Sequence, residues 1–161
     1  MNSFKPHILV LPEDAADHHL ALGFFLYPGL SMRNFCIAPK LGGWSKVLAE
    51  FEEEQITQMR KFKGRVLVML IDFDKNSSRI EKFHEAIPSD LKDRVFVLGV
   101  WSNPEALQAP HGCEGLEQHG SKLADDCANN NRQDYWQAPL FKHNLAELNG
   151  RDDQLKKILF G

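Results

Sequence analysis

Uninterrupted apolar runs recur along the chain, and segments with helical spacing separate them. The runs lie at 7–11, 34–39, 65–73 and 94–100, and they are rich in Val, Ile, Leu and Phe. Strands that are apolar on both faces, rather than alternating, are typical of parallel sheets covered by helices. The pattern therefore predicts four buried, parallel strands.

The segments between these strands have the features of helices. Residues 13–27 begin with acidic side chains, which the helix dipole favours at that end, and residues 44–62 have amphipathic spacing. A third helix is expected before Pro88, with Ser77 and Ser78 as its caps. The alternation predicts an α/β fold, a mostly parallel, four-stranded, Rossmann-like sheet with helices on both faces and the first strand beside the third.

The pattern changes in the last third of the chain, where no further strand is expected. Three helices are predicted there, at 116–129, 140–148 and 152–160. We interpret the chain, 1–161, as a single domain with an α/β core over 7–109 and a helical extension over 110–161. The extension is expected either to cap the sheet or to bind a protein partner.

Composition limits the classes of function. The chain has 161 residues, of which 43% are hydrophobic, and a net charge of −3, so an overall basic surface for nucleic acid is not expected. A local basic groove stays compatible with these values. Cys36, Cys113 and Cys127 are an odd number without tight spacing, which favours reduced thiols in the cytoplasm. Neither a signal peptide nor an apolar run of roughly 18 residues is visible, so no membrane segment is expected.

The most apolar run, 66–71, is followed by two acidic residues, Asp72 and Asp74. Residues two apart in a strand project to the same side, so both carboxylates are expected at the carboxyl edge of the sheet, where open α/β sheets bind ligands. Carboxylates this close repel each other unless a cation or proton lies between them, and Mg²⁺ prefers such oxygen ligands. The alternative is that both residues only form a turn and cap the next helix.

A second acidic group, Glu13, Asp14 and Asp17, follows the first strand. If the first and third strands are neighbours, Glu13 comes to lie beside Asp72. Acidic side chains from two strand ends would then share one crevice. The alternative is that the three residues only stabilise the first turn of their helix.

Together, Glu13-x-x-x-Asp17 and Asp72-x-Asp74 resemble the signature of Toprim domains, which occur in topoisomerases, DnaG-type primases, OLD-type nucleases and many small proteins. The resemblance covers about residues 7–109. It implies a compact α/β core in which Glu13, Asp72 and Asp74 hold Mg²⁺ or Mn²⁺.

In nuclease-like members of that family a further acid often follows the next strand, and Glu105 matches that position. Asp14 stands where the family usually has glycine, and no winged helix, zinc ribbon or ATPase domain accompanies the core. The layout is therefore most similar to a small, stand-alone member related to OLD-nuclease and primase cores.

A glycine-containing loop links the second strand to the next helix. Its residues Gly42, Gly43, Ser45 and Lys46 are candidates for binding phosphate at the start of a helix. The P-loop pattern is absent. The alternative is a glycine turn that only begins a helix.

These observations predict a Mg²⁺- or Mn²⁺-dependent nuclease or phosphoryl-transfer protein with Glu13, Asp72 and Asp74 as catalytic residues and metal ligands. Three further residues are candidates for the site: Asp17, Glu105 and His143, the last as a general acid or base or as a hydrogen-bond partner of a loop. The expected partner is a nucleic acid or a nucleotide.

Two alternatives stay open at the level of sequence. The first is a non-catalytic Toprim-like module whose acidic crevice binds a cation or a partner. The second is a receiver-like phosphoacceptor domain with an acidic pocket made by Glu13, Asp14 and Asp72, although the lysine expected after a fifth strand is not visible.

Overall fold

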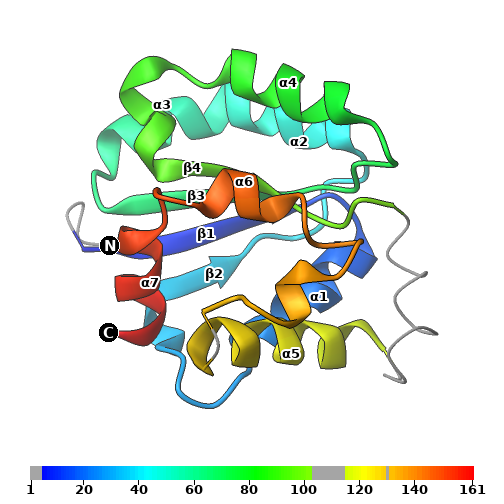
Figure 1. Cartoon of the computed structure of the whole chain (residues 1–161). Coiled ribbons are helices and arrows are strands. Elements are labelled where there is room, and N and C mark those ends of the chain that lie inside the picture. Colours follow the sequence, from blue (N-terminus) through cyan, green and yellow to red (C-terminus); the bar gives the residue numbers. More distant parts are fainter. Residues whose placement is uncertain (1–4, 103–114, 130) are drawn as a thin grey trace.

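A computed structural model describes residues 5–102, 115–129 and 131–161. Within these segments one four-stranded sheet is present (Figure 1), and all its neighbouring strands are parallel. Its strands are β1 (His7–Pro12), β2 (Phe35–Ile37), β3 (Arg65–Leu70) and β4 (Val95–Leu98). The order β2-β1-β3-β4 confirms the predicted α/β sheet and places β1 beside β3, the arrangement that begins flavodoxin-like folds.

The crossovers between strands carry the predicted helices, with two differences. The helix after β2 is a continuous rod of α2 (Trp44–Glu50), a π-helical turn (Phe51–Gln55) and α3 (Ile56–Lys61). The helix before β4 is α4 (Ser77–Ala86), and Asn76 caps it instead of the predicted serines. The cap forms because the side-chain oxygen Oδ1 of Asn76 accepts the Ser78 N–H at 2.9 Å.

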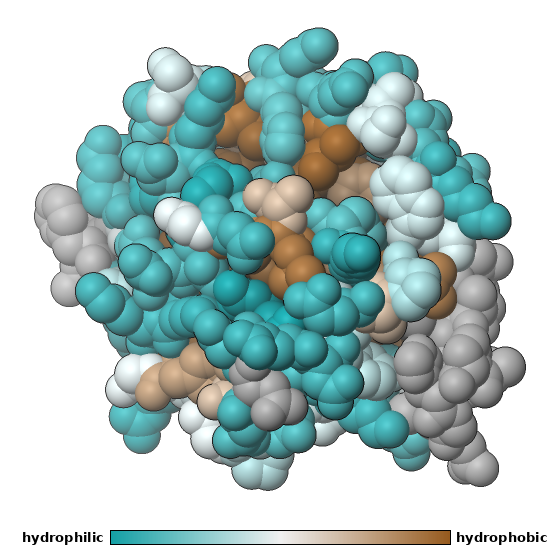
Figure 2. Space-filling view, in the orientation of Figure 1, coloured by the Kyte–Doolittle hydropathy of each residue, from teal (hydrophilic) through white to brown (hydrophobic). Residues whose placement is uncertain are grey.

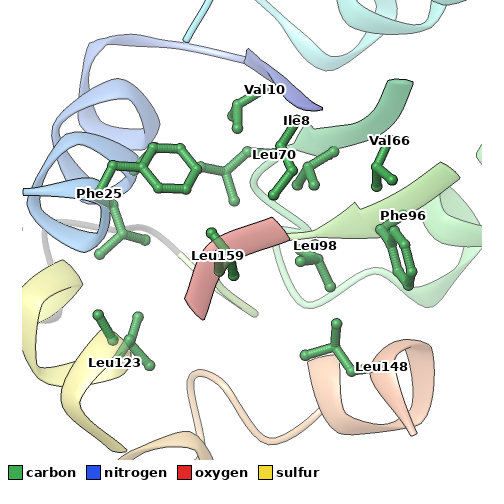
Figure 3. Packing of buried hydrophobic residues seen from close by; sticks show 14 of the residues in the cluster. Ile8, Val10, Phe25, Val66, Leu70, Phe96, Leu98, Leu123, Leu148 and Leu159 are labelled. Atoms are coloured by element: carbon green, nitrogen blue, oxygen red, sulfur yellow. The ribbon is translucent and has the colours of Figure 1, made fainter. Parts of the chain in front are cut away.

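Helices cover both faces of the sheet. The α2–α3 rod and α4 lie on one face, whereas α1 (Ala15–Phe25), α5 (Leu116–Asn129), α6 (Asn144–Leu148) and α7 (Asp153–Phe160) lie on the other (Figure 1). Side chains of β1, β3 and β4 there meet those of α1, α5, α6 and α7 in one cluster (Figure 3). The last third of the chain is thus a cap on the sheet, and it shares the hydrophobic core of the predicted 7–109 unit.

The outer edge of β4 is covered by side chains of α6. The Asn144 side chain donates to the Gly99 carbonyl at 2.8 Å and accepts the Gly99 N–H at 3.0 Å, as a neighbouring strand would. Glu147 lies one helical turn further along and accepts the Val97 N–H at 3.4 Å. This cover protects an edge that could otherwise pair with another chain.

Helices α1 and α5 cross at backbone contact, because a Cβ on Gly120 would lie only 2.1 Å from the Leu20 carbonyl oxygen. The crossing fixes α1, whose first turn carries part of the acidic site. No helix in the described segments is both long and apolar enough to cross a membrane.

Candidate acidic site at the carboxyl edge of the sheet

Glu13 and Asp72 meet at the carboxyl edge of the two central strands. Glu13 directly follows β1, and its N–H donates to the Leu70 carbonyl of β3 at 2.9 Å. Its carboxylate accepts the backbone N–H of Asp72 at 2.6 Å. The predicted proximity of Glu13 and Asp72 is therefore confirmed.

Asp72 and Asp74 are arranged differently from the prediction. Strand β3 ends at Leu70, and Asp74 and Lys75 have φ of 47° and 56°, so the argument from strand alternation is wrong. Asp72 instead uses its Oδ1 to accept the Asp74 N–H at 2.9 Å, which closes a tight turn. The Asp74 side chain is 73% exposed and lies 3.8 Å from the Arg79 guanidinium, so it does not lie in a closed crevice with Asp72.

Two acids in the first turn of α1 have separate roles. Asp14 caps the helix by accepting the Asp17 N–H at 3.0 Å. Asp17 is fully buried, and neither of its carboxyl oxygens has a hydrogen bond of normal geometry with the described residues. Only Asp14 thus fulfils the capping alternative.

Burial raises the pKa of Asp17 to about 9, and the contact with Asp14 and the nearby charges of Glu13 and Asp72 add to the increase. Asp17 is consequently protonated at neutral pH. The pKa values of Glu13 and Asp72 are also raised, first by burial and then by neighbouring acids, although a backbone N–H and Arg79 oppose the increase at each. The site therefore holds more carboxyl groups than the nearby N–H donors and Arg79 can stabilise in the charged form.

Arg79, in the first turn of α4, is a site residue that the sequence reasoning missed. Its guanidinium donates to the Asp72 carbonyl at 2.6 Å, lies 3.8 Å from the Asp74 carboxylate and stands over the Trp44 ring at 5.4 Å. A signal was available in the sequence, because the dipole disfavours a cation in the first turn of a helix unless another group compensates it. Here the carboxylates provide that compensation.

The glycine loop is attached to the acidic edge through Glu13. The N–H groups of Gly42 and Gly43 both donate to the Glu13 carbonyl, at 2.7 and 3.3 Å. They are therefore engaged within the protein, and a phosphate contact through this loop depends on the exposed side chains of Ser45 and Lys46. The Lys46 side chain folds back over the glycine turn: its Nζ lies 3.6 Å from where a Cβ would stand if Gly42 had a side chain. The phosphate site stays a prediction.

The two remaining candidates have different outcomes. Glu105 lies outside the described residues. His143 packs against the rings of Phe73, at 4.8 Å, and Trp101, at 5.3 Å, and so lies behind the turn of Asp72 and Asp74. Burial lowers the pKa of His143 to about 4, partly opposed by the Gly99 backbone, so its imidazole is neutral at physiological pH.

The side chains at this edge have the chemistry of a site for a hard cation. Carboxylate oxygens are the ligands that Mg²⁺ and Mn²⁺ take, and Glu13 and Asp72 supply such oxygens at this edge. In the positions seen here, no group of three or more His, Cys, Asp or Glu side chains among the described residues could hold a metal ion. The donors are of the right type, but their side chains do not converge as a coordination shell.

Comparison with protein-family models, curated protein sequences and solved structures finds no match to this chain. The similarity to Toprim domains therefore depends on the short motifs around Glu13 and Asp72.

Proposed function

We propose that the protein is a Mg²⁺- or Mn²⁺-dependent phosphoryl-transfer protein of nuclease type, acting on a nucleic acid or nucleotide at the carboxyl edge of its sheet. The meeting of Glu13 and Asp72 supports this proposal best. The strand order reverses between β1 and β3, and ligands of open α/β sheets bind in the crevice outside such a switch point.

In this proposal Glu13, Asp72 and Asp74 would hold the cation once their side chains turn toward one another, and the cation would neutralise charge at a phosphate and its leaving oxygen. Arg79 adds a guanidinium at the same edge, oriented by the Asp72 carbonyl and the Trp44 ring. A planar guanidinium of this kind is suited to phosphate oxygens. Because buried Asp17 is protonated, it adds no negative charge to the repulsion among the other acids.

A non-catalytic binding module is the second candidate. The observation in its favour is that Glu13 already joins β1 to β3 through the Asp72 N–H, while Arg79 contacts the Asp72–Asp74 turn. These contacts stabilise the edge without any chemistry. The same acids could then serve to bind a cation or a partner.

The test compares wild type with Asp72→Asn and with Asp93→Asn, an exposed acid on another surface. Labelled single-stranded DNA, duplex DNA and RNA are incubated with Mn²⁺, with Mg²⁺ or with EDTA. We expect cleavage that needs the metal and falls on the order of 100-fold in Asp72→Asn. Asp93→Asn should cleave at the wild-type rate.

Thermal melting of the same three proteins separates the two candidates. A cation that binds only the folded state raises the melting temperature once its concentration passes the dissociation constant. A Mn²⁺-dependent shift that Asp72→Asn loses, without cleavage of any substrate, would establish the binding module. Wild type that neither shifts at millimolar metal nor cleaves would eliminate the metal site.

A further inference from the structure

The face of the sheet that α1, α5, α6 and α7 cover encloses a cavity of about 100 Å³. Its walls are apolar and include Val10, Val68 and Leu98 of the sheet and Leu20 and Leu123 of the helices. An apolar cavity of roughly 150 Å³ is large enough for benzene, so this space suits a molecule of a few carbon atoms. The carboxylates proposed to hold the cation do not line it.

The strands show that this space remains accessible. Val68 and Leu98 keep 7% and 8% of their surface exposed, whereas Leu67 and Val97, on the opposite face of the same strands, have 0%. Central strand residues of a filled core would all be inaccessible. Figure 2 shows apolar side chains at the bottom of a hollow at the centre of the face that α6 and α7 border in Figure 1.

Charged side chains form one end of this cavity. Arg132 is only 7% exposed and forms an ion pair with Asp152, yet its Nε–H has no hydrogen-bond partner among the described residues. Lys156 lies 3.9 Å from the same carboxylate and keeps about a third of its side chain exposed. Two cations thus face one carboxylate beside an apolar space, because the carboxylate of the neighbouring buried acid, Asp126, accepts the backbone N–H groups of Asp134 and Trp136 instead.

The backbone holds the Arg132 side chain inward at an energetic cost. Asn131 and Arg132 adopt φ of 53° and 64°, a region that asparagine tolerates and arginine rarely occupies. Conformations of this kind persist when the surrounding structure enforces them, and they cluster at ligand sites. The strain gives a second reason to look for a ligand of the Arg132 guanidinium.

We propose that this cavity binds a small apolar monocarboxylate, with a hydrocarbon body of about three to five carbons among the leucine and valine side chains. Its carboxylate pairs with the Arg132 Nε–H and the Lys156 ammonium. A charged hydrogen bond at a buried guanidinium fixes the orientation of the molecule, and burial of the hydrocarbon supplies most of the affinity. This site is independent of the function proposed for the carboxyl edge.

The test measures binding of hexanoate and of hexan-1-ol, its neutral counterpart, by titration calorimetry and thermal melting. We expect saturable binding of hexanoate, a raised melting temperature, and about tenfold weaker binding of the alcohol. Val68→Phe should fill the cavity and abolish binding of both. Leu26→Phe, at a side chain that is 52% exposed, is the matched control and should bind as wild type does.

Lys156→Gln provides the second variant, because Arg132 substitutions would leave buried Asp152 without its partner and could unfold the chain. The glutamine can keep the hydrogen bond that Lys156 donates to Asn131. It should weaken hexanoate about tenfold and leave hexan-1-ol unchanged. Equal affinity for acid and alcohol, no saturable binding by folded wild type, or hexanoate affinity unaffected by Lys156→Gln would each overturn the proposal.

Discussion

The protein holds two groups of buried or half-buried carboxyl side chains, and they differ in how many donors and cations stabilise their charged form. The edge group lies at the carboxyl end of the sheet and the cap group in the last third of the chain. Their members are Glu13, Asp17 and Asp72 in the edge group, and Asp126, Glu147 and Asp152 in the cap group. The comparison separates acids whose charge the fold stabilises from acids whose charge it leaves less stabilised.

Each member of the cap group has a nearby donor or cation. Glu147 lies 2.8 Å from His84 Nε2 and 3.0 Å from Arg151 Nη1, and it accepts a strand N–H as well. Asp126 accepts the Trp136 N–H at 2.9 Å. Asp152 forms the ion pair with Arg132.

The carboxyl groups of the edge group have fewer hydrogen-bond donors and cations around them. Glu13 and Asp72 each accept one backbone N–H, and Asp17 has no hydrogen bond of normal geometry with the described residues. All three pKa values are raised, and burial is the main cause. Acids that are gathered in this way reduce the stability of the free protein, and a bound cation would recover it.

The largest effect is expected in the cap group. Glu147→Ala should lower the free energy of unfolding by roughly 3 kcal/mol, because it leaves the buried Val97 N–H without its acceptor and removes the ion pair with the half-buried Arg151. Urea denaturation measures the change. Glu81→Ala, an exposed glutamate on α4, is the control and should change stability by less than about 0.5 kcal/mol. A loss below about 1 kcal/mol at Glu147 would show that the cap group is not compensated as the geometry indicates.

The two groups also differ in what their sequence reveals. The edge group was predictable in part, because apolar runs define strands and the acids of neighbouring parallel strands reach the same edge. Glu13 and Asp72 were found in this way. The turn at Asp74 was not, because two successive non-glycine residues with positive φ leave no mark in the hydrophobic pattern.

The cap group could not be predicted from the sequence. Glu147 contacts His84 and Val97, which lie 63 and 50 positions away, and nothing local indicates such pairs. Arg79 carried a sequence signal as a cation in the first turn of a helix, but its partners Trp44 and Asp72 lie outside that helix and could not be identified from the sequence. Tertiary contacts decide these positions, whereas periodicity decides the strands and helices.

An intermediate effect of opposite sign is expected at Asp17. Its pKa is raised from 3.8 to about 9 in the folded state, so between these pH values the folded protein retains a proton that the unfolded chain has lost. The stability of wild type should therefore fall as pH rises through this range. Asp17→Asn replaces the protonated acid with a neutral group, and we expect it to stabilise the protein by about 2 kcal/mol at pH 7.

Melting curves at pH 4.5 and pH 8 measure this difference. The gain from Asp17→Asn should be smaller at pH 4.5, which lies only just above the ordinary pKa of 3.8, and larger at pH 8, which lies far above it. Asp125→Asn, an exposed acid on α5, should show no such trend. A loss of stability in Asp17→Asn at pH 8 would mean that the buried carboxyl is charged and compensated, as in the cap group.

The smallest effect on stability is expected for the cation nearest to the glycine loop. Lys46 is exposed, so Lys46→Ala should change the free energy of unfolding by less than about 0.5 kcal/mol. If its ammonium contacts a phosphate at the acidic edge, the substitution should still weaken binding of a short oligonucleotide in the presence of Ca²⁺ or Mg²⁺. The slope of the logarithm of affinity against the logarithm of salt concentration should also become shallower by about one, because one phosphate contact is lost.

The control is Lys63→Ala. It removes an equally exposed lysine just before β3, at the opposite end of the sheet, and should leave both affinity and salt dependence unchanged. Fluorescence anisotropy across a series of salt concentrations measures both quantities. Equal affinities for the two variants would reduce the glycine loop to the start of a helix, and the edge group would then have to bind its ligand without a contact from Lys46.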